Sequence, residues 1–216
     1  MNMQITWNGL GSFSISTKPI QGDVTVVTDP FSDKVGVKLP RALTASVVLQ
    51  SHGGDMASNV KAVTAEEGKH PFVISYAGEF EVKGVFVHGI RAPKKSGEEH
   101  TIYRISTEGI RIAFLGALDR TLKDDELKRL GDIDILIVPV GGNNVASKTI
   151  ANDIVSQVEP RVVIPSHYEI KGLKEKQEGV EGFCKEVSCP NEEMNKYKVK
   201  KKTLPQEDMQ MVILSK

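Results

Sequence analysis

The stretch Val47-Val48-Leu49-Gln50-Ser51-His52-Gly53-Gly54-Asp55-Met56-Ala57-Ser58-Asn59 decides the fold of this chain. Its apolar half predicts a buried strand over residues 46–50. This strand runs directly into a glycine-rich loop that carries a histidine. Because an imidazole can hold a metal ion or simply make hydrogen bonds, the rest of the chain must decide between a metal site and a structural loop.

The overall composition is that of a globular protein. The chain has 216 residues, of which 39% are hydrophobic and 26% are charged. No repeat or low-complexity linker interrupts it, so we expect a single domain over residues 1–216. The 28 basic residues balance the 28 acidic ones, and this net charge of zero does not demand a polyanionic partner.

A cytoplasmic location is predicted from the absence of a membrane-helix pattern and of a signal-peptide pattern in the sequence. No apolar run approaches the roughly 20 residues that a membrane helix needs, so we expect no membrane partner. The first residues read as a strand and not as a signal peptide. The two cysteines, Cys184 and Cys189, are expected to be reduced thiols, which indicates a cytoplasmic protein.

The order of predicted elements indicates the fold class. Short strand-like runs dominate the first half, up to residue 115, and end in a hairpin signal at Thr107-Glu108-Gly109. After residue 115, strands alternate with helices, which are predicted over residues 121–130, 147–158 and 179–187. A shorter helix is predicted earlier, over residues 58–64. A meander followed by β-α alternation favours an α/β protein with sheets inside and helices outside.

Five further motifs, taken in order, resemble the metallo-β-lactamase superfamily over nearly the whole chain. They resemble, in particular, the branch labelled Zn-dependent hydrolase of the β-lactamase fold. This resemblance implies a four-layer αββα sandwich. The motifs are Ile5-Thr6-Trp7-Asn8-Gly9, Thr28-Asp29-Pro30-Phe31, Gly78-Glu79-Phe80-Glu81-Val82-Lys83-Gly84-Val85, residues 132–142, and Ile164-Pro165-Ser166-His167-Tyr168.

The resemblance also implies where metal ligands should stand. Intact members hold two metal ions, usually zinc, which lower the pKa of a shared hydroxide. His52 matches the first histidine of the family's H-x-H-x-D-H motif, and His167 matches the last ligand histidine. The other ligand positions fall on Gly54, Met56, Ala57, Lys94, Ala117 and Arg120.

Few metal ligands therefore remain. His52 and His167 survive, and Asp55 is a third vestigial position only if the motif is shifted by one residue. We expect no bound metal and no other cofactor, with His52 and His167 as the most that a reduced site could use. Lys94 and Arg120 would place cations where the metals stood. They are expected to replace the metal charge or hold an anion, in a positive pocket with no carboxylate cluster opposite.

Simpler interpretations stay open for each of these residues. His52 and His167 can serve loop hydrogen bonds, and Asp55 suits a turn. Asp29, before Pro30, is expected to tie down its own turn. Lys94 can be an ordinary solvated loop charge.

Three functions follow from this reading. The leading one is a pseudoenzyme with a binding or structural role. Its partner is an unidentified small molecule or protein, and a homo-oligomer stays open. The second is a metal-dependent hydrolase of a phosphoester, lactone or amide that uses a reduced site at His52 and His167, so enzyme status and catalytic residues stay unassigned. The third is nucleic-acid binding, which rests on a run of lysines near the C-terminus: Lys196, Lys198, Lys200, Lys201 and Lys202. It is disfavoured because alternation places most of these lysines on one solvated strand face.

Overall fold

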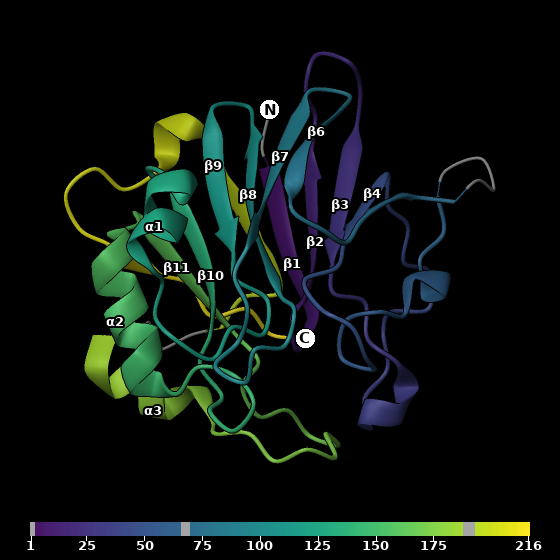
Figure 1. Cartoon of the computed structure of the whole chain (residues 1–216). Coiled ribbons are helices and arrows are strands. Elements are labelled where there is room, and N and C mark those ends of the chain that lie inside the picture. Colours follow the sequence, from purple (N-terminus) through teal and green to yellow (C-terminus); the bar gives the residue numbers. More distant parts are fainter. Residues whose placement is uncertain (1–2, 66–69, 188–192) are drawn as a thin grey trace.

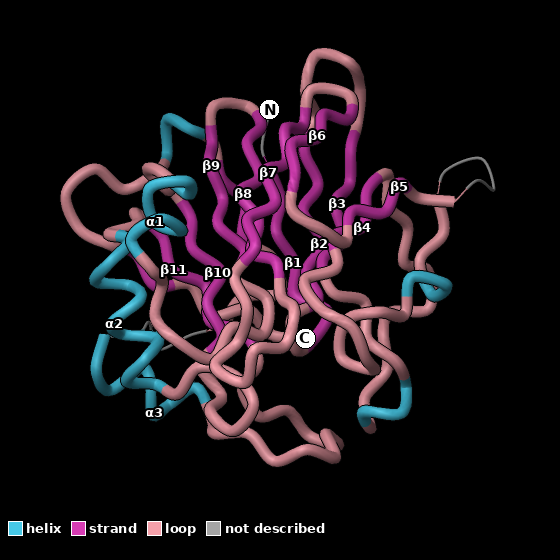
Figure 2. Tube along the Cα trace, viewed as in Figure 1, coloured by secondary structure: helices cyan, strands magenta, loops and turns pink. Residues whose placement is uncertain are grey.

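Two β-sheets face each other in the computed structural model, which describes residues 3–65, 70–187 and 193–216 (Figures 1 and 2). The first sheet has six strands in the order β12-β1-β2-β3-β4-β5. Strands β3, β4 and β5 run parallel, and the other neighbouring pairs are antiparallel. The strands are β1 (Met3–Gly9), β2 (Ser12–Thr17), β3 (Val24–Thr28), β4 (Val47–Leu49), β5 (Phe72–Ile74) and β12 (Tyr197–Val199).

The second sheet has seven strands in the order β13-β11-β10-β9-β8-β7-β6. Its meander half, from β6 to β9, is antiparallel, and β9, β10, β11 and β13 run parallel. This is the change from meander to β-α alternation that the sequence predicts. The strands are β6 (Gly78–Val82), β7 (Val85–Arg91), β8 (Thr101–Thr107), β9 (Ile110–Phe114), β10 (Ile135–Pro139), β11 (Val162–Ser166) and β13 (Gln210–Met211).

The main hydrophobic core lies between the two sheets. Alternate residues of β1 and β2 are buried while their neighbours are partly exposed, so each strand directs one face into this core. Ile5 and Phe13 from the first sheet, and Tyr103 and Phe114 from the second, are fully buried there. Strands β10 and β11 are buried at every position, as expected for strands covered on both faces.

Helices cover the outer face of the seven-stranded sheet, at the left of Figure 1. They are α1 (Asp124–Leu130), α2 (Lys148–Val158) and α3 (Val180–Val187). The predicted α/β sandwich is therefore confirmed. Over the six-stranded sheet, the outer layer in the described part of the chain consists of loops and short 3-10 turns, which enclose a small cluster around Val27 and Val48.

Several predicted boundaries moved. Ser147 caps α2 as expected, its hydroxyl accepting from the backbone N–H of Ile150. Helix α1 begins at Asp124, three residues after the predicted start, because the carboxylate of Glu126 folds back to accept from the Lys123 N–H. The segment predicted as a short helix over 58–64 forms only a 3-10 turn, Val60–Ala62.

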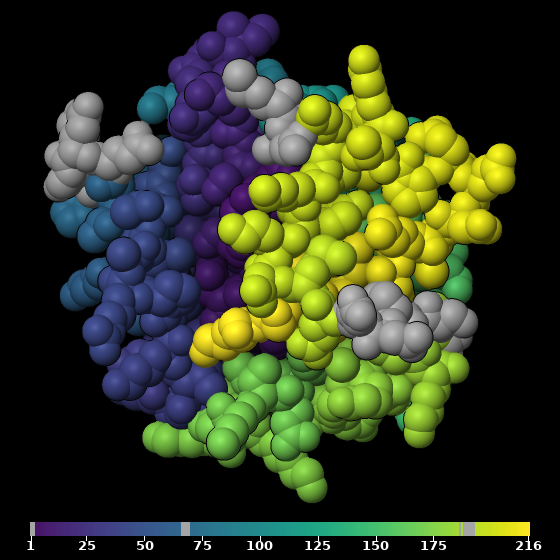
Figure 3. All heavy atoms as spheres, turned by 180° about the vertical axis from the view of Figure 1, so that it is seen from behind, coloured from purple at the N-terminus to yellow at the C-terminus, as the bar shows by residue number. Residues whose placement is uncertain are grey.

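The C-terminal segment lies against the N-terminal strands on the face of the molecule seen in Figure 3. Edge strand β12 exposes Lys198 while Tyr197 and Val199 are buried, as alternation predicts, but the strand ends there and Lys201–Thr203 form a 3-10 turn. Cys184 is disulfide-bonded, so the expectation of reduced thiols is wrong for this residue. Cys189 lies outside the described residues. Among the described helices, none is long and apolar enough to cross a membrane.

Candidate functional site

Loops from both sheets meet at one edge of the sandwich, the lower edge in Figure 1. The parallel strands β3, β4, β9, β10 and β11 all end at this edge, because parallel strands present their carboxyl ends together. The loops that follow them carry Asp29, His52, Ala117, Asn144 and His167 respectively. Residues far apart in the sequence are thus collected into one site.

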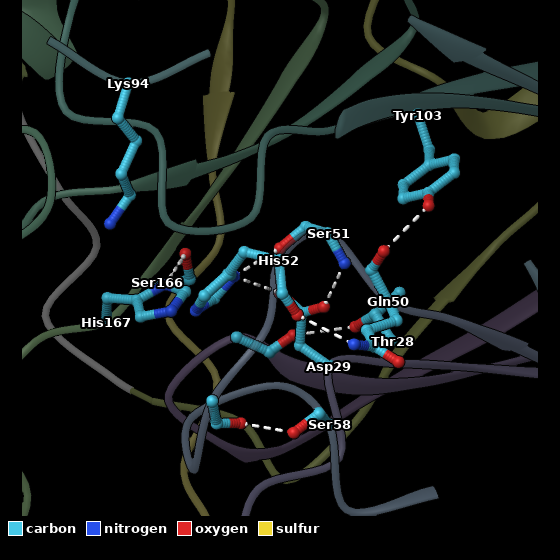
Figure 4. Close-up of polar contacts among 12 residues, drawn as sticks. Thr28, Asp29, Gln50, Ser51, His52, Ser58, Lys94, Tyr103, Ser166 and His167 are labelled. Atoms are coloured by element: carbon cyan, nitrogen blue, oxygen red, sulfur yellow. Dashed lines mark hydrogen bonds and ion pairs between the residues drawn. The ribbon is translucent and has the colours of Figure 1, made fainter. Parts of the chain in front are cut away.

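A chain of hydrogen bonds holds the His52 loop against strand β3 (Figure 4). The Asp29 carboxylate accepts from the Ser51 N–H at 2.7 Å and from the Ser51 hydroxyl at 2.5 Å. Ser51 Oγ lies 2.8 Å from Nδ1 of His52. Asp29 therefore ties down the His52 loop and not only its own turn, which corrects the expectation for this residue.

Burial has the largest effect on the pKa values of Asp29 and His52. Asp29 is fully buried, and desolvation raises its pKa to about 7 although both Ser51 hydrogen bonds oppose the change. Desolvation, followed by the charge of the Lys94 ammonium, lowers the pKa of His52 to about 4. His52 is therefore a neutral imidazole near pH 7, with Nδ1 engaged by Ser51.

His167 lies deeper than His52 and is fully buried. Its Nδ1 lies 3.1 Å from Ser166 Oγ, and its Nε2 has no hydrogen-bond partner among the described residues. Burial, followed by the charges of His52 and Lys94, lowers its pKa to about 3. The loops are packed so closely here that a Cβ on Gly11 would lie 2.6 Å from the His167 ring. His167 is thus a buried, neutral imidazole at the carboxyl end of β11.

A third histidine belongs to the site and was missed by sequence analysis. His100 is 2% exposed, and its ring stacks on that of His52 with centroids 5.8 Å apart. Neither of its ring nitrogens has a partner among the described residues. The signal that could have found it is its position, immediately before a strand that forms a hairpin with the strand leading to Lys94.

An open cleft of about 420 Å³ lies in front of His52. Lys94 reaches into this region, with its Nζ donating to the Asn144 carbonyl at 3.0 Å, and its charge lowers the pKa of all three histidines (Figure 4). Three carboxylates, those of Asp55, Glu98 and Asp119, also line the cleft, whereas the sequence predicted a positive pocket with no carboxylate cluster opposite. The cleft is lined by His52, Gly53, Gly54, Asp55, Met56, Lys94, Ser96, Glu98, Asp119, Asn143 and Asn144.

Two of the three carboxylates in the cleft are already engaged. Asp55 lies in the turn after His52 and forms an exposed ion pair with Lys34 at 3.5 Å. Asp119 accepts from the Lys95 N–H at 3.0 Å. The side chain of Glu98 has no such contact among the described residues.

The structure does not bring Arg120 to these residues. Its guanidinium forms a two-pronged pair with the buried carboxylate of Glu126, at 2.6 and 2.8 Å, and also donates to the carbonyls of Pro93 and Thr121. With these partners Arg120 fixes the start of α1 to the loop that carries Lys94. It is therefore a structural residue, and among the described residues that line the cleft Lys94 is the only cation.

The residues present do not fit a binuclear metal centre. Ala57 and Ala117, which the resemblance places at two ligand positions, are buried methyl groups. Lys94 adds an ammonium where a ligand would be needed. Within the described residues, no group of three or more His, Cys, Asp or Glu side chains is placed to hold a metal ion.

Known proteins resemble both this sequence and this structure. A family model described as beta-lactamase superfamily domain matches residues 4–167. A UPF0173 protein of Pyrococcus abyssi is 40% identical over 78 residues, which are 36% of this chain and only 34% of that relative. A UPF0173 metal-dependent hydrolase of Thermoplasma acidophilum is 24% identical over 197 residues, covering 77% of this chain and 84% of that protein.

Solved structures agree with the sequence relatives. A protein of Thermotoga maritima, assigned to the Zn-dependent hydrolases of the metallo-β-lactamase superfamily, superposes with a TM-score of 0.76 at 27% identity and covers 98% of both chains. The metallo-β-lactamase-fold protein YhfI of Bacillus subtilis has a TM-score of 0.63 at 12% identity, covering 100% of this chain and 97% of its own, and it supports the fold alone. This chain belongs to the β-lactamase superfamily of metallo-β-lactamase-fold, metal-dependent hydrolases.

Proposed function

We propose that this protein is a metal-independent member of its family that binds a small anionic molecule in the cleft. The observation that carries the proposal is the Lys94 ammonium, which extends into the region of His52, His100 and His167 and depresses their pKa values. A fixed cation beside neutral imidazoles can hold a carboxylate or phosphate through charge-assisted hydrogen bonds.

The acidic residues of the cleft limit the affinity of this site. Asp55 is partly compensated by its exposed ion pair with Lys34, whereas the backbone N–H that donates to Asp119 does not neutralise that carboxylate. Glu98 opposes anion binding most directly. We therefore expect a simple anion such as inorganic phosphate to bind with a millimolar rather than a micromolar Kd.

The direct test is a titration with inorganic phosphate, followed by NMR or calorimetry. Lys94→Met keeps the length of the side chain and removes its charge, and it should weaken binding at least about tenfold, which corresponds to the loss of one charge-assisted hydrogen bond. Lys95→Met is the matched control, since Lys95 does not line the cleft. Equal phosphate binding by the wild type and Lys94→Met would overturn the proposal.

Metal analysis tests the alternative, a hydrolase with a reduced site at His52 and His167. The unbonded Nε2 of His167 is the observation in its favour. Protein purified without a chelator or a His tag should contain far less than one zinc, manganese or iron per chain. A near-stoichiometric metal that is lost in His52→Gln and His167→Gln would instead establish the hydrolase.

A further inference from the structure

Hydrophobic side chains gather at one edge of the sandwich. Six large hydrophobic residues are exposed in the described part of the chain, and three of them, Phe72, Val73 and Tyr76, lie within five consecutive positions. They belong to β5 and to the link that follows it. Figure 2 shows β5 at the outer edge of the six-stranded sheet, on the side away from α1, α2 and α3. An apolar surface that is gathered in this way usually marks an interaction site.

The aromatic rings of this region pack on one another. The Phe80 ring, on β6, lies 6.3 Å from the Phe72 ring and 5.5 Å from the Tyr76 ring, measured between centroids. Since β5 and β6 are the last strands of the two sheets, these rings join the free edges of both sheets. We call Phe72, Val73, Tyr76 and Phe80 the edge patch. Its rings hold one another in place, so they present a fixed surface.

The backbone of β5 also has an open side. The Phe72 N–H donates to the Ser46 carbonyl, and the Ile74 carbonyl accepts from the Gln50 N–H, both at 2.9 Å. Successive residues of a strand direct their N–H and C=O groups to opposite sides, so those of Val73 point away from β4. No strand in the described part of the chain pairs with that side. Such an edge can accept a further strand.

Charge distinguishes β5 from the other edges. Strand β6 exposes Glu79 and Glu81, and strand β12 exposes Lys198. When two copies of one strand pair antiparallel across a two-fold axis, these like charges come close together and repel. The fourth edge, β13, is only two residues long. Residues 70–78, by contrast, contain no Asp, Glu, Lys or Arg, so β5 can pair with a copy of itself without repulsion between like charges.

We propose that β5 pairs with β5 of a second copy of this chain, antiparallel and across a two-fold axis at Val73. The two six-stranded sheets then form one continuous sheet. The two Val73 residues exchange a pair of backbone hydrogen bonds across the axis. Phe72 of each copy lies beside Ile74 of the other, so part of the edge patch is covered and apolar surface is removed from water. The proposal does not depend on anion binding in the cleft.

Sedimentation of the full-length chain over a wide range of concentrations tests the pairing. The mass should rise with concentration from that of one chain toward that of two, and no further, because a two-fold contact closes on itself. Val73→Lys should raise the Kd of the dimer at least about tenfold, since it places two ammonium groups opposite each other. Phe86→Lys adds the same charge at an exposed position of β7, which is not an edge strand, and this control should leave the Kd unchanged.

Val73→Asp tests which residues face each other. Alone it should not self-associate, but an equimolar mixture with Val73→Lys should form heterodimers, because the two substituted residues lie directly opposite each other. Circular dichroism checks that both variants fold. A wild type that stays monomeric would overturn the pairing and leave the edge patch to a partner of another kind. The inference is also wrong if Val73→Lys and Val73→Asp each dimerise as the wild type does, or if their mixture stays monomeric.

Discussion

At the residue scale, the site is defined by close packing around Ser51. Gly116 follows β9 with a φ of +54°, and a Cβ added there would lie 2.2 Å from Ser51 Oγ and 2.9 Å from His100 Nε2. Only glycine fits this approach without moving both side chains. The Asp29–Ser51–His52 chain and the placement of His100 therefore depend on one glycine.

We expect Gly116→Ala to lower the free energy of unfolding by about 2 kcal/mol or more, because overpacking adds to an unfavourable backbone conformation. Gly53→Ala is the control, since a Cβ at Gly53 meets no atom within 4 Å. Urea unfolding monitored by circular dichroism measures both. Equal stability of the two variants would show that the packing around Ser51 is looser than described.

At the element scale, Arg120 couples α1 to the loop that carries Lys94. The Arg120 side chain is 12% exposed and that of Glu126 is 2% exposed, so their ion pair is shielded from solvent. Removing one partner of such a pair leaves the other charge buried without compensation.

Arg120→Met should therefore lower the free energy of unfolding by about 3 kcal/mol. It should also weaken phosphate binding, because the Pro93 carbonyl loses its donor and Lys94 is no longer held in place. Arg91→Met breaks an exposed pair with Glu99 and serves as the control. It should leave stability unchanged, since exposed pairs contribute little. Chemical denaturation measures the free energy of unfolding of both variants. If Arg120→Met were as stable as the wild type, Arg120 would not couple α1 to the loop that carries Lys94.

At the scale of the whole molecule, we expect the fold to be stable without help from a metal. The two sheets enclose one large core, and the site is held by hydrogen bonds and packing. We expect the melting temperature to be the same with and without EDTA. A protein that relies on a bound metal loses binding free energy on chelation, so a fall of many degrees would contradict this prediction.

Stability should also fall as the pH is lowered from 7 to 5. His52, His100 and His167 have lowered pKa values in the folded protein, so unfolding takes up about three protons between roughly pH 4 and 6. Asp29, with its raised pKa of about 7, releases about one proton on unfolding. The net uptake is small at pH 7 and rises to about two protons near pH 5, where the free energy of unfolding falls by about 2.7 kcal/mol per pH unit.

Asp29→Asn isolates the opposing contribution. Asparagine keeps a group that can hydrogen-bond to Ser51, but it releases no proton. The dependence on pH should therefore become steeper, approaching the uptake of about three protons. Urea unfolding at pH 5, 6 and 7 gives both slopes, and a flat profile for the wild type would mean that the histidines are hydrated.

The sequence by itself determined the sandwich and much of the position of the site within it. Strand periodicity, the turn from meander to β-α alternation, and motifs such as Ile164–Tyr168 are local patterns, and local patterns set which elements form and in what order. The resemblance to the metallo-β-lactamase superfamily implied that His52, Lys94 and, with a shift of one residue, Asp55 belong to one site, and all three line the cleft.

Only the tertiary structure decided which neighbours these residues meet. Arg120 faces Glu126, six residues away, because α1 starts later than its pattern indicates, and the cation is thereby withdrawn from the cleft. His100 enters the site through the hairpin of β7 and β8, whose register brings it onto the His52 ring. Such contacts depend on the packing of two sheets against each other, and packing is a property of the assembled chain that no local pattern contains.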